Sequence, residues 1–402
     1  MKKIYSAIFW IANTITLACI AITATFIINA KATDDASMKN VNAYDEMIPQ
    51  NIDDSVANTE PVEPEITETT VTLCATGDNL AHTTVYNKCL TENGTYDFTG
   101  IYENIKPLIS SYDLAVINQE TVLITDPKLI SSYPCFGTPA EMASAIVDTG
   151  FDIVLQATNH IMDKKIAGVE STLNVWQHYP DMTVLGIHAD ETDANNIDII
   201  EKNGIKFAMF NYTYGTNGIP IPSDYVYMID TLDDKDKLIT DIQAAENQVD
   251  FTVCFLHIGD EYVYTPTAYQ KSCIDEVIDA GADVIICAHP HVIEPYEWVT
   301  TENGNKGLVY YSCGNFVSGQ DKLPRILGGI ATVEFKKTSD GICSIENFDF
   351  IPIVTHRTRG NDGDTKVYLL QDYTDDLAAQ HSISGITVQK LWDLWNSVCL
   401  SQ

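Results

Sequence analysis

The chain has 402 residues, 45% of them hydrophobic, and a formal net charge of −33. This acidity argues against nucleic-acid binding, because contacts with phosphates require clustered Lys and Arg. It also repels a polyanionic substrate unless a metal ion or a local basic patch intervenes. The hydrophobic fraction is large enough to form a substantial core.

The first 30 residues contain a long uncharged run. Residues Ile4 to Ala30 carry no charged side chain, and Lys2 and Lys3 precede them. A helix of this length spans a bilayer, and the leading lysines favour an N-terminus inside and the rest of the chain outside. We expect a single-pass anchor in the cell membrane with the domain extracytoplasmic. A cleaved signal peptide, which would give a secreted protein, is the alternative.

Residues 31–70 have the composition of an extended, disordered linker. They contain ten acidic residues, two lysines, three prolines and one aromatic residue, Tyr44. Such a segment buries too little apolar surface to offset its conformational entropy, and like charges keep it extended. The pattern changes at Val71, which predicts one domain over residues 71–402 with its core motifs between residues 71 and 356.

The rest of the chain alternates between strand-like and helix-like patterns. Strand-like apolar runs occupy Val71–Thr76, Leu114–Asn118, Asp152–Ala157, Thr183–Gly186, Ile205–Asn211, Phe251–Leu256, Asp283–Ala288 and Leu308–Ser312. Helical patterns separate several of these runs. Strands that alternate with helices indicate an α/β fold.

Capping signals mark several of the predicted helices. Thr138-Pro139 and Thr265-Pro266 each suggest a threonine N-cap followed by proline at the first helical position. Gly150 and Gly281 suit the position directly after a helix end. The last pattern, Val388–Leu400, predicts a short amphipathic helix that packs on the domain.

The ten cysteines do not form a metal or redox motif. No C-x-x-C pair occurs, which excludes a zinc ribbon or thioredoxin motif. Four cysteines lie in apolar runs and are expected to be buried free thiols: Cys74, Cys254, Cys287 and Cys313. Cys89 and Cys135 lie in loop-like segments, and the sequence leaves open whether they pair.

Polar side chains follow five of the predicted strands. In chain order they are Asp78, Glu120, Asn159, His257 and His289. Ligands bind at the carboxyl ends of strands in open α/β sheets, so we expect these side chains to meet. Carboxylate, amide and imidazole groups without a thiolate are ligands for Mn²⁺, Fe or Zn²⁺. Alone, Asp78 and Glu120 are weak signals and Asn159 fits a capped helix start, whereas His-x-His after a strand is moderately specific; the five together predict a metal site.

Two short motifs extend this set. In His289-Pro290-His291, an extended backbone would place both imidazoles on one side. In the segment 159–163, a helix starting there would let Asp163 orient His160 and stabilise its charged form. Converging carboxylates raise each other's pKa, and a bound metal ion removes that cost.

Six motifs occur in series. They are Gly77-Asp78, Asn118-Gln119-Glu120-Thr121, Asn159-His160-Ile161-Met162-Asp163, His257-Ile258-Gly259-Asp260-Glu261-Tyr262, His289-Pro290-His291 and Ser312-Cys313-Gly314-Asn315-Phe316. This series resembles the CapA family of capsule-synthesis and poly-γ-glutamate biosynthesis proteins. That family has tryptophan where this chain has Ile258, a departure that changes no candidate ligand. The resemblance covers about residues 71–356.

The resemblance implies a metallophosphoesterase-like fold, which is a two-sheet α/β sandwich with flanking helices. It implies one divalent ion held by Asp78, His257 and His291, a second held by Asn159 and His289, and Glu120 in the usual bridging position. The Asp-x-His of metallophosphoesterases is absent, and His82 lies out of register and is interpreted as a loop residue. The resemblance therefore leaves the number of ions at one or two.

The resemblance also implies roles for residues around the metal. His160 would protonate a leaving group as the general acid, and Asp163 would orient it. Asn118, Glu261 and Asn315 would contact the substrate or support the ligands.

Two hypotheses for function follow. The first is a metal-dependent hydrolase or transferase that acts on a phosphoester or a γ-linked amide of a surface polymer, such as poly-γ-glutamate, or its precursor. The second is a non-catalytic accessory subunit of a membrane polymer synthase. A surface sensor or germination-type factor is a weaker third. The expected partners are the polymer, synthase subunits and, through the N-terminal helix, the membrane, but not nucleic acid.

Overall fold

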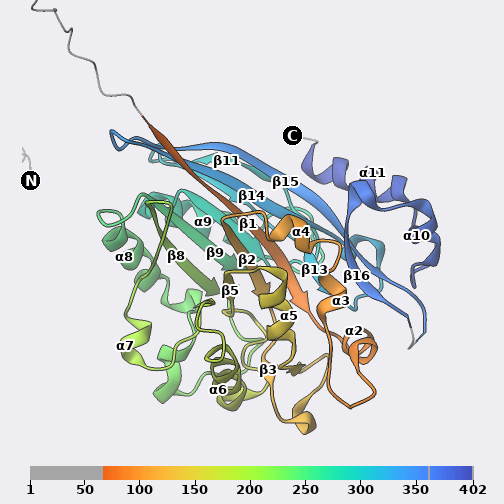
Figure 1. Ribbon diagram of the computed structural model, residues 1–402. Helices are drawn as coiled ribbons and strands as arrows, with labels where there is room; N and C mark the ends of the chain where they lie inside the picture. The colour runs from red at the N-terminus through yellow and green to blue at the C-terminus, as the bar shows by residue number, and fades with distance from the viewer. Residues whose placement is uncertain (1–66, 361–362, 401–402) are drawn as a thin grey trace, which may run out of the picture. The chain divides into compact units, whose positions relative to one another are not determined.

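The computed structural model describes residues 67–360 and 363–400, and they contain two facing β-sheets (Figure 1). The first sheet has eight strands in the order β16-β15-β14-β1-β2-β5-β6, with β13 also paired to β1. Its strands are β1 (Glu68–Leu80), β2 (Leu114–Gln119), β5 (Ile153–Leu155), β6 (Thr183–Leu185), β13 (Asn315–Ser318), β14 (Leu327–Thr338), β15 (Cys343–Arg357) and β16 (Thr365–Leu369).

The second sheet has six strands in the order β11-β12-β10-β9-β8-β7. They are β7 (Asp198–Lys202), β8 (Ile205–Thr213), β9 (Phe251–His257), β10 (Val284–Ala288), β11 (Tyr296–Thr300) and β12 (Lys306–Tyr310). The four central strands run parallel, whereas β7 and β11 are antiparallel edges. A separate short pair joins β3 (Leu123–Ile124) and β4 (Thr138–Pro139).

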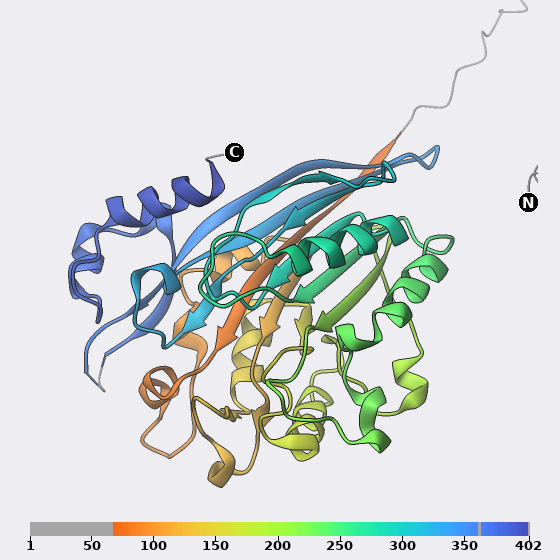
Figure 2. The same cartoon turned by 180° about the vertical axis from the view of Figure 1, so that it is seen from behind.

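Helices cover the outer faces of both sheets (Figures 1 and 2). Those on the first sheet include α3 (Thr99–Tyr102), α5 (Met142–Thr149) and α6 (Lys165–Trp176), and those on the second are α8 (Lys235–Ala245) and α9 (Ala268–Ala280). The others are α2 (Thr83–Tyr86), α4 (Lys106–Ile109), α7 (Glu191–Ala194), α10 (Asp375–Gln380), α11 (Val388–Cys399), and the 3₁₀ turns η1 (Asn87–Cys89), η2 (Pro127–Leu129), η3 (Ser223–Met228), η4 (Leu232–Asp234), η5 (Leu323–Arg325) and η6 (Leu370–Asp372). The predicted two-sheet α/β sandwich with flanking helices is confirmed.

The alternation along β1 explains why its sequence is apolar on both faces. Val71, Leu73 and Ala75 belong to the cluster between the sheets, whereas Cys74 belongs to the cluster under the helices. Successive strand residues point to opposite faces, so a strand covered on both sides needs a continuous apolar run. All nine cysteines in the described part of the chain are free thiols, so Cys89 and Cys135 do not pair there.

Two of the predicted helix starts are wrong in detail. Thr138–Pro139 forms β4 instead, and α5 begins later with Glu141 at its N-cap and no side-chain cap. In α9 the N-cap is Thr267, which forms a capping box with Gln270. A hydroxyl and a glutamine three residues apart satisfy two backbone N–H groups, which favours this start over the earlier Thr-Pro pair.

The expected membrane anchor at Ile4–Ala30 lies outside the described residues, as does nearly all of the expected linker. Within residues 67–360 and 363–400, no helix has both the length and the apolar character needed to cross a bilayer.

A close backbone approach fixes the end of β1. The Asp78 N–H donates to the Gly314 carbonyl oxygen at 2.9 Å. A Cβ at Gly77 would overlap that same oxygen. Only glycine therefore fits before Asp78, and the contact sets where the Asp78 side chain points.

Gly77→Ala should lower the free energy of unfolding by about 1–3 kcal/mol, because the added methyl group meets backbone that cannot rotate away. Thermal unfolding of the two proteins measures this. Gly100→Ala is the matched control, since Gly100 is an exposed position of α3 where a Cβ has open space. Equal melting temperatures for Gly77→Ala and wild type would contradict the close approach.

Candidate metal site

The six predicted metal ligands lie together at the carboxyl ends of strands from both sheets. Asp78 lies near the end of β1, and His257 ends β9. Glu120 directly follows β2, and His289 directly follows β10. Asn159 and His291 lie in the loops after β5 and β10. All six side chains are buried. The two sheets therefore deliver one buried polar cluster at their strand ends.

Glu120 is at the centre of this cluster. Its Oε1 lies 3.7 Å from His291 Nε2, 3.9 Å from His257 Nε2 and 3.9 Å from His160 Nε2. The side chain is fully buried, and neither carboxylate oxygen has a hydrogen-bond partner among the described residues. A buried carboxylate without a donor is costly, so this arrangement calls for a cation.

Two groups of three residues could each hold a metal ion. One is Asp78, Glu120 and His291, and the other is Glu120, His257 and His289; within each, the ligand atoms lie within 4.8 Å of one another. Asn159 Oδ1 lies 3.0 Å from His257 Nε2, next to the second group. Glu120 belongs to both groups, as a bridging residue would. The expected grouping put His257 with Asp78 and His291. In the structure His257 lies with His289 and Asn159.

The backbone of the His-Pro-His motif is not extended, so that expectation is wrong. His289 has φ +104° and His291 has φ +57°. Non-glycine residues rarely adopt such values, and strained residues of this kind cluster at functional sites. The His289 N–H donates to Asp78 Oδ1 at 3.3 Å, and His291 Nδ1 lies 2.9 Å from Asp78 Oδ2. Asp78 thus holds the motif in its unusual conformation.

A turn, not the expected helix, brings His160 and Asp163 together. The Asp163 N–H donates to the His160 carbonyl at 3.1 Å, and α6 begins only at Lys165. His160 Nδ1 lies 2.7 Å from Asp163 Oδ2, which also accepts the Phe136 N–H at 2.6 Å. The Phe136 ring packs edge-on against the imidazole, with centroids 4.8 Å apart. The Asp163 carboxylate and the Phe136 ring thus fix the imidazole with Nε2 directed toward Glu120.

Burial and the neighbouring charges shift the pKa values of the clustered side chains. Burial, followed by the nearby Asp78 carboxylate, raises the pKa of Glu120 well above its usual value. Burial lowers the pKa of His257, and it lowers the pKa of His289 to about 3. Burial acts in the same direction on His291, but the carboxylates of Glu120 and Asp78 outweigh it and raise the pKa to about 9.

The donor set fits a divalent cation. The unpartnered buried atoms include both oxygens of Glu120 and Nδ1 of His289. Neutral imidazoles with depressed pKa values offer lone pairs, and oxygen and nitrogen donors without thiolates suit Mn²⁺, Fe or Zn²⁺.

Asn118 and Asn315 lie behind the candidate ligands, whereas Glu261 lies at the edge of the site. Asn118 donates to Asp78 Oδ1 at 2.8 Å, and Asn315 Oδ1 lies 3.1 Å from His291 Nδ1. Both are buried and orient ligands, as groups behind a metal ligand do. Glu261 is exposed in the loop after β9, and its charge raises the pKa values of Glu120 and His291. It therefore lies at the rim.

Two residues near the site were not anticipated from the sequence. The Tyr214 ring lies 4.6 Å from the His289 ring, centroid to centroid. Asn217, at φ +52°, accepts from Asn159 Nδ2 at 3.2 Å and from the Tyr214 hydroxyl at 3.3 Å. The only sequence signal was Asn217-Gly218, a dipeptide typical of turns. The loop after β8 therefore closes the site from the second sheet.

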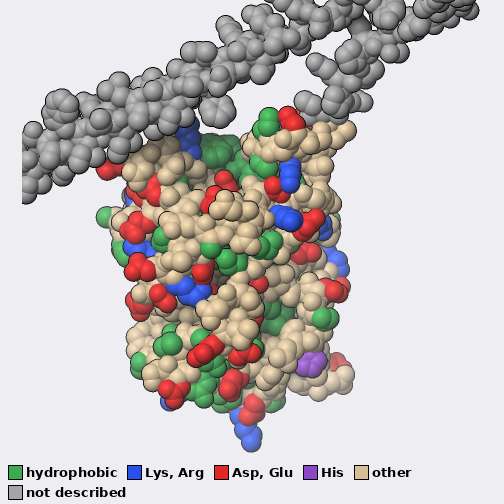
Figure 3. All heavy atoms as spheres, turned by 90° about the vertical axis from the view of Figure 1, so that its left-hand side faces the viewer, with side chains coloured by type: hydrophobic (Ala, Val, Ile, Leu, Met, Phe, Trp, Pro, Cys, Tyr) green, Lys and Arg blue, Asp and Glu red, His purple; other side chains and the backbone are tan. Residues whose placement is uncertain are grey.

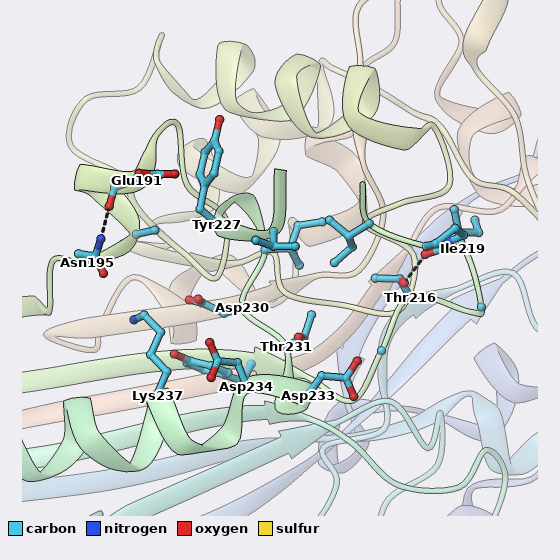
Figure 4. A pocket seen from close by; sticks show the side chains of 18 residues that line it. Glu191, Asn195, Thr216, Ile219, Tyr227, Asp230, Thr231, Asp233, Asp234 and Lys237 are labelled. Atoms are coloured by element: carbon cyan, nitrogen blue, oxygen red, sulfur yellow. Dashed lines mark hydrogen bonds between the residues drawn. The ribbon is translucent and has the colours of Figure 1, made fainter. Parts of the chain in front are cut away.

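A cavity of about 800 Å³ lies beyond this loop (Figure 4). Four acidic side chains help to line it, Glu191, Asp230, Asp233 and Asp234, and Lys237 lies near Asp234. None of the candidate metal ligands lines it. Its size alone therefore does not make it the reactive centre.

Comparisons with known proteins agree on one family. The bacterial capsule synthesis protein family PGA_cap matches residues 72–320. The chain is 26% identical over 260 residues to the PGA biosynthesis protein CapA of Bacillus subtilis (strain 168), over 64% of this chain and 65% of that protein. It is 25% identical over 229 residues to the capsule biosynthesis protein CapA of Bacillus anthracis, over 55% of this chain and 54% of that protein. The chain thus covers less than two thirds of either relative.

Among solved structures, NAD nucleotidase (NadN) of Haemophilus influenzae matches with a TM-score of 0.44 and 15% identity, over 82% of this chain and 60% of that one. A likeness this low carries no argument about the site or the function.

Two facing sheets that gather carboxylate, amide and imidazole side chains at their strand ends define an α/β protein with a candidate site for divalent metal ions. The chain belongs to the PGA_cap family of bacterial capsule synthesis proteins, since the family model covers more than half of it. The resemblance to the CapA family is thereby confirmed.

The purified protein should contain at least one Mn, Fe or Zn ion per chain, and chelation should lower its melting temperature because the ion binds only the folded state. Elemental analysis and thermal unfolding measure both. His289→Ala and His291→Ala should each weaken metal binding. His178→Ala should not, since His178 is exposed near the end of α6. Metal-free protein that does not respond to added metal would contradict the site.

Glu120→Gln should have opposite effects with and without metal. Metal-free Glu120→Gln should be more stable than metal-free wild type by about 1 kcal/mol or more, because it removes a buried carboxyl group that has no hydrogen-bond donor and whose charged form burial disfavours. The stabilisation by added metal should be lost. Denaturant titrations of both forms test this, with the exposed Glu170→Gln on α6 as control. A metal-free Glu120→Gln protein less stable than wild type would refute the unpaired carboxylate.

Proposed function

We propose that this protein is an extracytoplasmic, metal-dependent hydrolase or transferase that acts on a surface polymer of the poly-γ-glutamate type or on its precursor. The observation that carries the proposal is Glu120, a fully buried carboxylate without a donor, surrounded by imidazoles from both sheets. A purely structural core has no use for such a cluster, because apolar residues would stabilise it better. The names of the two relatives, a PGA and a capsule biosynthesis protein, indicate the process.

The residues that would hold one or two divalent ions are Asp78, Glu120, Asn159, His257, His289 and His291. A divalent cation there would supply Lewis acidity toward an oxygen atom of the scissile group. The chain itself orients these ligands through Asn118 and Asn315, and it excludes water by burying them.

His160 is the proposed general acid. Its Nδ1 is held by the Asp163 carboxylate at 2.7 Å, which leaves Nε2 directed at the cluster. A carboxylate behind an imidazole stabilises the imidazolium and fixes its orientation. His160 can therefore give the proton on Nε2 to a departing oxygen or nitrogen, which suits both a phosphoester and a γ-linked amide.

The proposal places the domain outside the cytoplasm, held at the cell membrane by the uncharged segment Ile4–Ala30 behind Lys2 and Lys3. The linker would hold the domain away from the membrane surface, where it would meet the polymer and the subunits of a membrane synthase.

A His160→Asn variant should fold and retain metal but lose about 10²- to 10⁴-fold in the rate of cleavage, because proton transfer to the leaving group is lost. A screen of the full-length protein against phosphoesters and γ-glutamyl oligomers, with metal analysis of the variant, measures this. His178→Asn is the matched control. Normal polymer output in cells carrying His160→Asn would rule out the catalytic role and favour an accessory subunit of the synthase.

A further inference from the structure

All the arginines of this chain gather in one region. The 402 residues include only three, Arg325, Arg357 and Arg359. Two cavities, of about 540 and 410 Å³, share Thr84, Arg357 and Ser382 in their linings. Arg325 lines the first cavity and Arg359 the second. In a chain of net charge −33, this clustering of arginines is the marked exception to the acidic pattern.

Arg357 carries a buried charge that forms no close ion pair within the described residues. It ends β15 and is only 5% exposed. Its guanidinium donates to the Gln320 carbonyl at 2.6 Å and to Thr84 Oγ1 at 3.3 Å, and its Nε has no partner among the described residues. No ion pair within 4 Å in residues 67–360 and 363–400 involves an arginine. A buried, unpaired guanidinium calls for an anion.

Arg325 lies on the side of this region that faces the candidate metal site. Its guanidinium stacks 3.5 Å from the centre of the Tyr262 ring, and the Tyr262 ring lies 6.0 Å from the His291 ring. The stacking fixes the planar group, so little entropy is lost when it binds a ligand.

Gln320 joins Arg357 to the same site. Its carbonyl accepts from Arg357, and its Oε1 accepts from Asn315 Nδ2 at 3.1 Å. Asn315 in turn contacts His291 at 3.1 Å. Gln320 therefore links the buried Arg357 guanidinium to Asn315, which orients the candidate metal ligand His291.

The charge around the arginines differs from the charge on other parts of the molecule. The residues that line the cavity beyond the β8 loop include four acidic side chains and Lys237 (Figure 4), and acidic side chains are spread over the side of the molecule seen in Figure 3. Only the exposed Asp321 places a carboxylate in the lining of the first arginine cavity. An anionic ligand would thus be repelled elsewhere and attracted here.

We infer that Arg357 and Arg325 form a subsite for an oxyanion, a carboxylate or phosphate group of the substrate, beside the candidate metal site. The neighbouring cavity at Arg359 extends the subsite into a longer binding groove, which could bind the next anionic group of a polymer. Guanidinium groups bind such oxyanions through paired N–H donors, which lysine cannot reproduce. The inference rests on the proposed function for the identity of the polymer but not for the binding of the anion.

Binding can be measured without turnover. The full-length protein, treated with chelator at low salt, is titrated with a short γ-linked glutamate oligomer, the same oligomer with amidated side groups, and inorganic polyphosphate. Arg357→Gln should weaken binding of the anionic probes about tenfold or more, and Arg325→Gln by a smaller factor. Arg357→Lys should restore only part of the affinity. Lys206→Gln should bind as wild type, because Lys206 lies at the start of β8, far from its carboxyl end.

Each outcome decides a separate point. Arginine-dependent binding of the glutamate oligomer supports a carboxylate subsite, and arginine-dependent binding of polyphosphate alone supports a phosphate subsite. Wild-type affinity in both arginine variants, or equal binding of the amidated oligomer, would overturn the inference. The melting temperature of each variant shows that it is folded, and Arg325→Gln keeps the test valid if Arg357→Gln does not fold. A protein that binds anions but cleaves nothing would refute the proposed function alone.

Discussion

The burial of the Glu120 carboxylate among imidazoles is the constraint on which the rest of the site depends. Glu120 follows a fully buried strand and has no donor of its own, so its charge must be met by groups from elsewhere. His257 and His291 come from the other sheet, which couples the relative position of the two sheets to the electrostatics of one side chain. A cation between them would stabilise the sandwich and the site together.

The backbone strain at the site follows from the same constraint. His289 and His291 adopt positive φ values, and Asp78 holds both through a main-chain and a side-chain contact. Asp78 is itself fixed by the approach of β1 to Gly314, which a side chain at Gly77 would prevent. Strain of this kind persists only where the surroundings over-determine the conformation. The rigid strand ends therefore hold the imidazoles in place before any ligand arrives.

The sequence predicted the parts of this structure that depend on local pattern. All eight predicted strands exist, since apolar runs of that length form strands wherever both faces are covered. The ends of those strands identified Glu120, His257 and His289 as neighbours. The conformation of residues 289–291 was not predictable, because Asp78, 211 positions away, imposes it. The long strand β15 was missed because polar residues interrupt the pattern of its exposed first half, and β14 was missed because two glycines interrupt the apolar pattern of its buried first half.

The arginine region could not be predicted from the sequence for a different reason. No motif contains Arg325 or Arg357, and net charge predicts repulsion of anions from the whole chain. A charge acts over about 8–10 Å at physiological ionic strength. The positions of nearby charges therefore determine the local potential more than the net charge of the chain does. Arg325, which stacks on the Tyr262 ring next to His291, and the buried Arg357 can reverse the local potential while the acidic surface keeps anions away elsewhere. A polyanion would then meet one attractive entrance, which would lead its anionic groups past Arg357 toward Glu120 and His160.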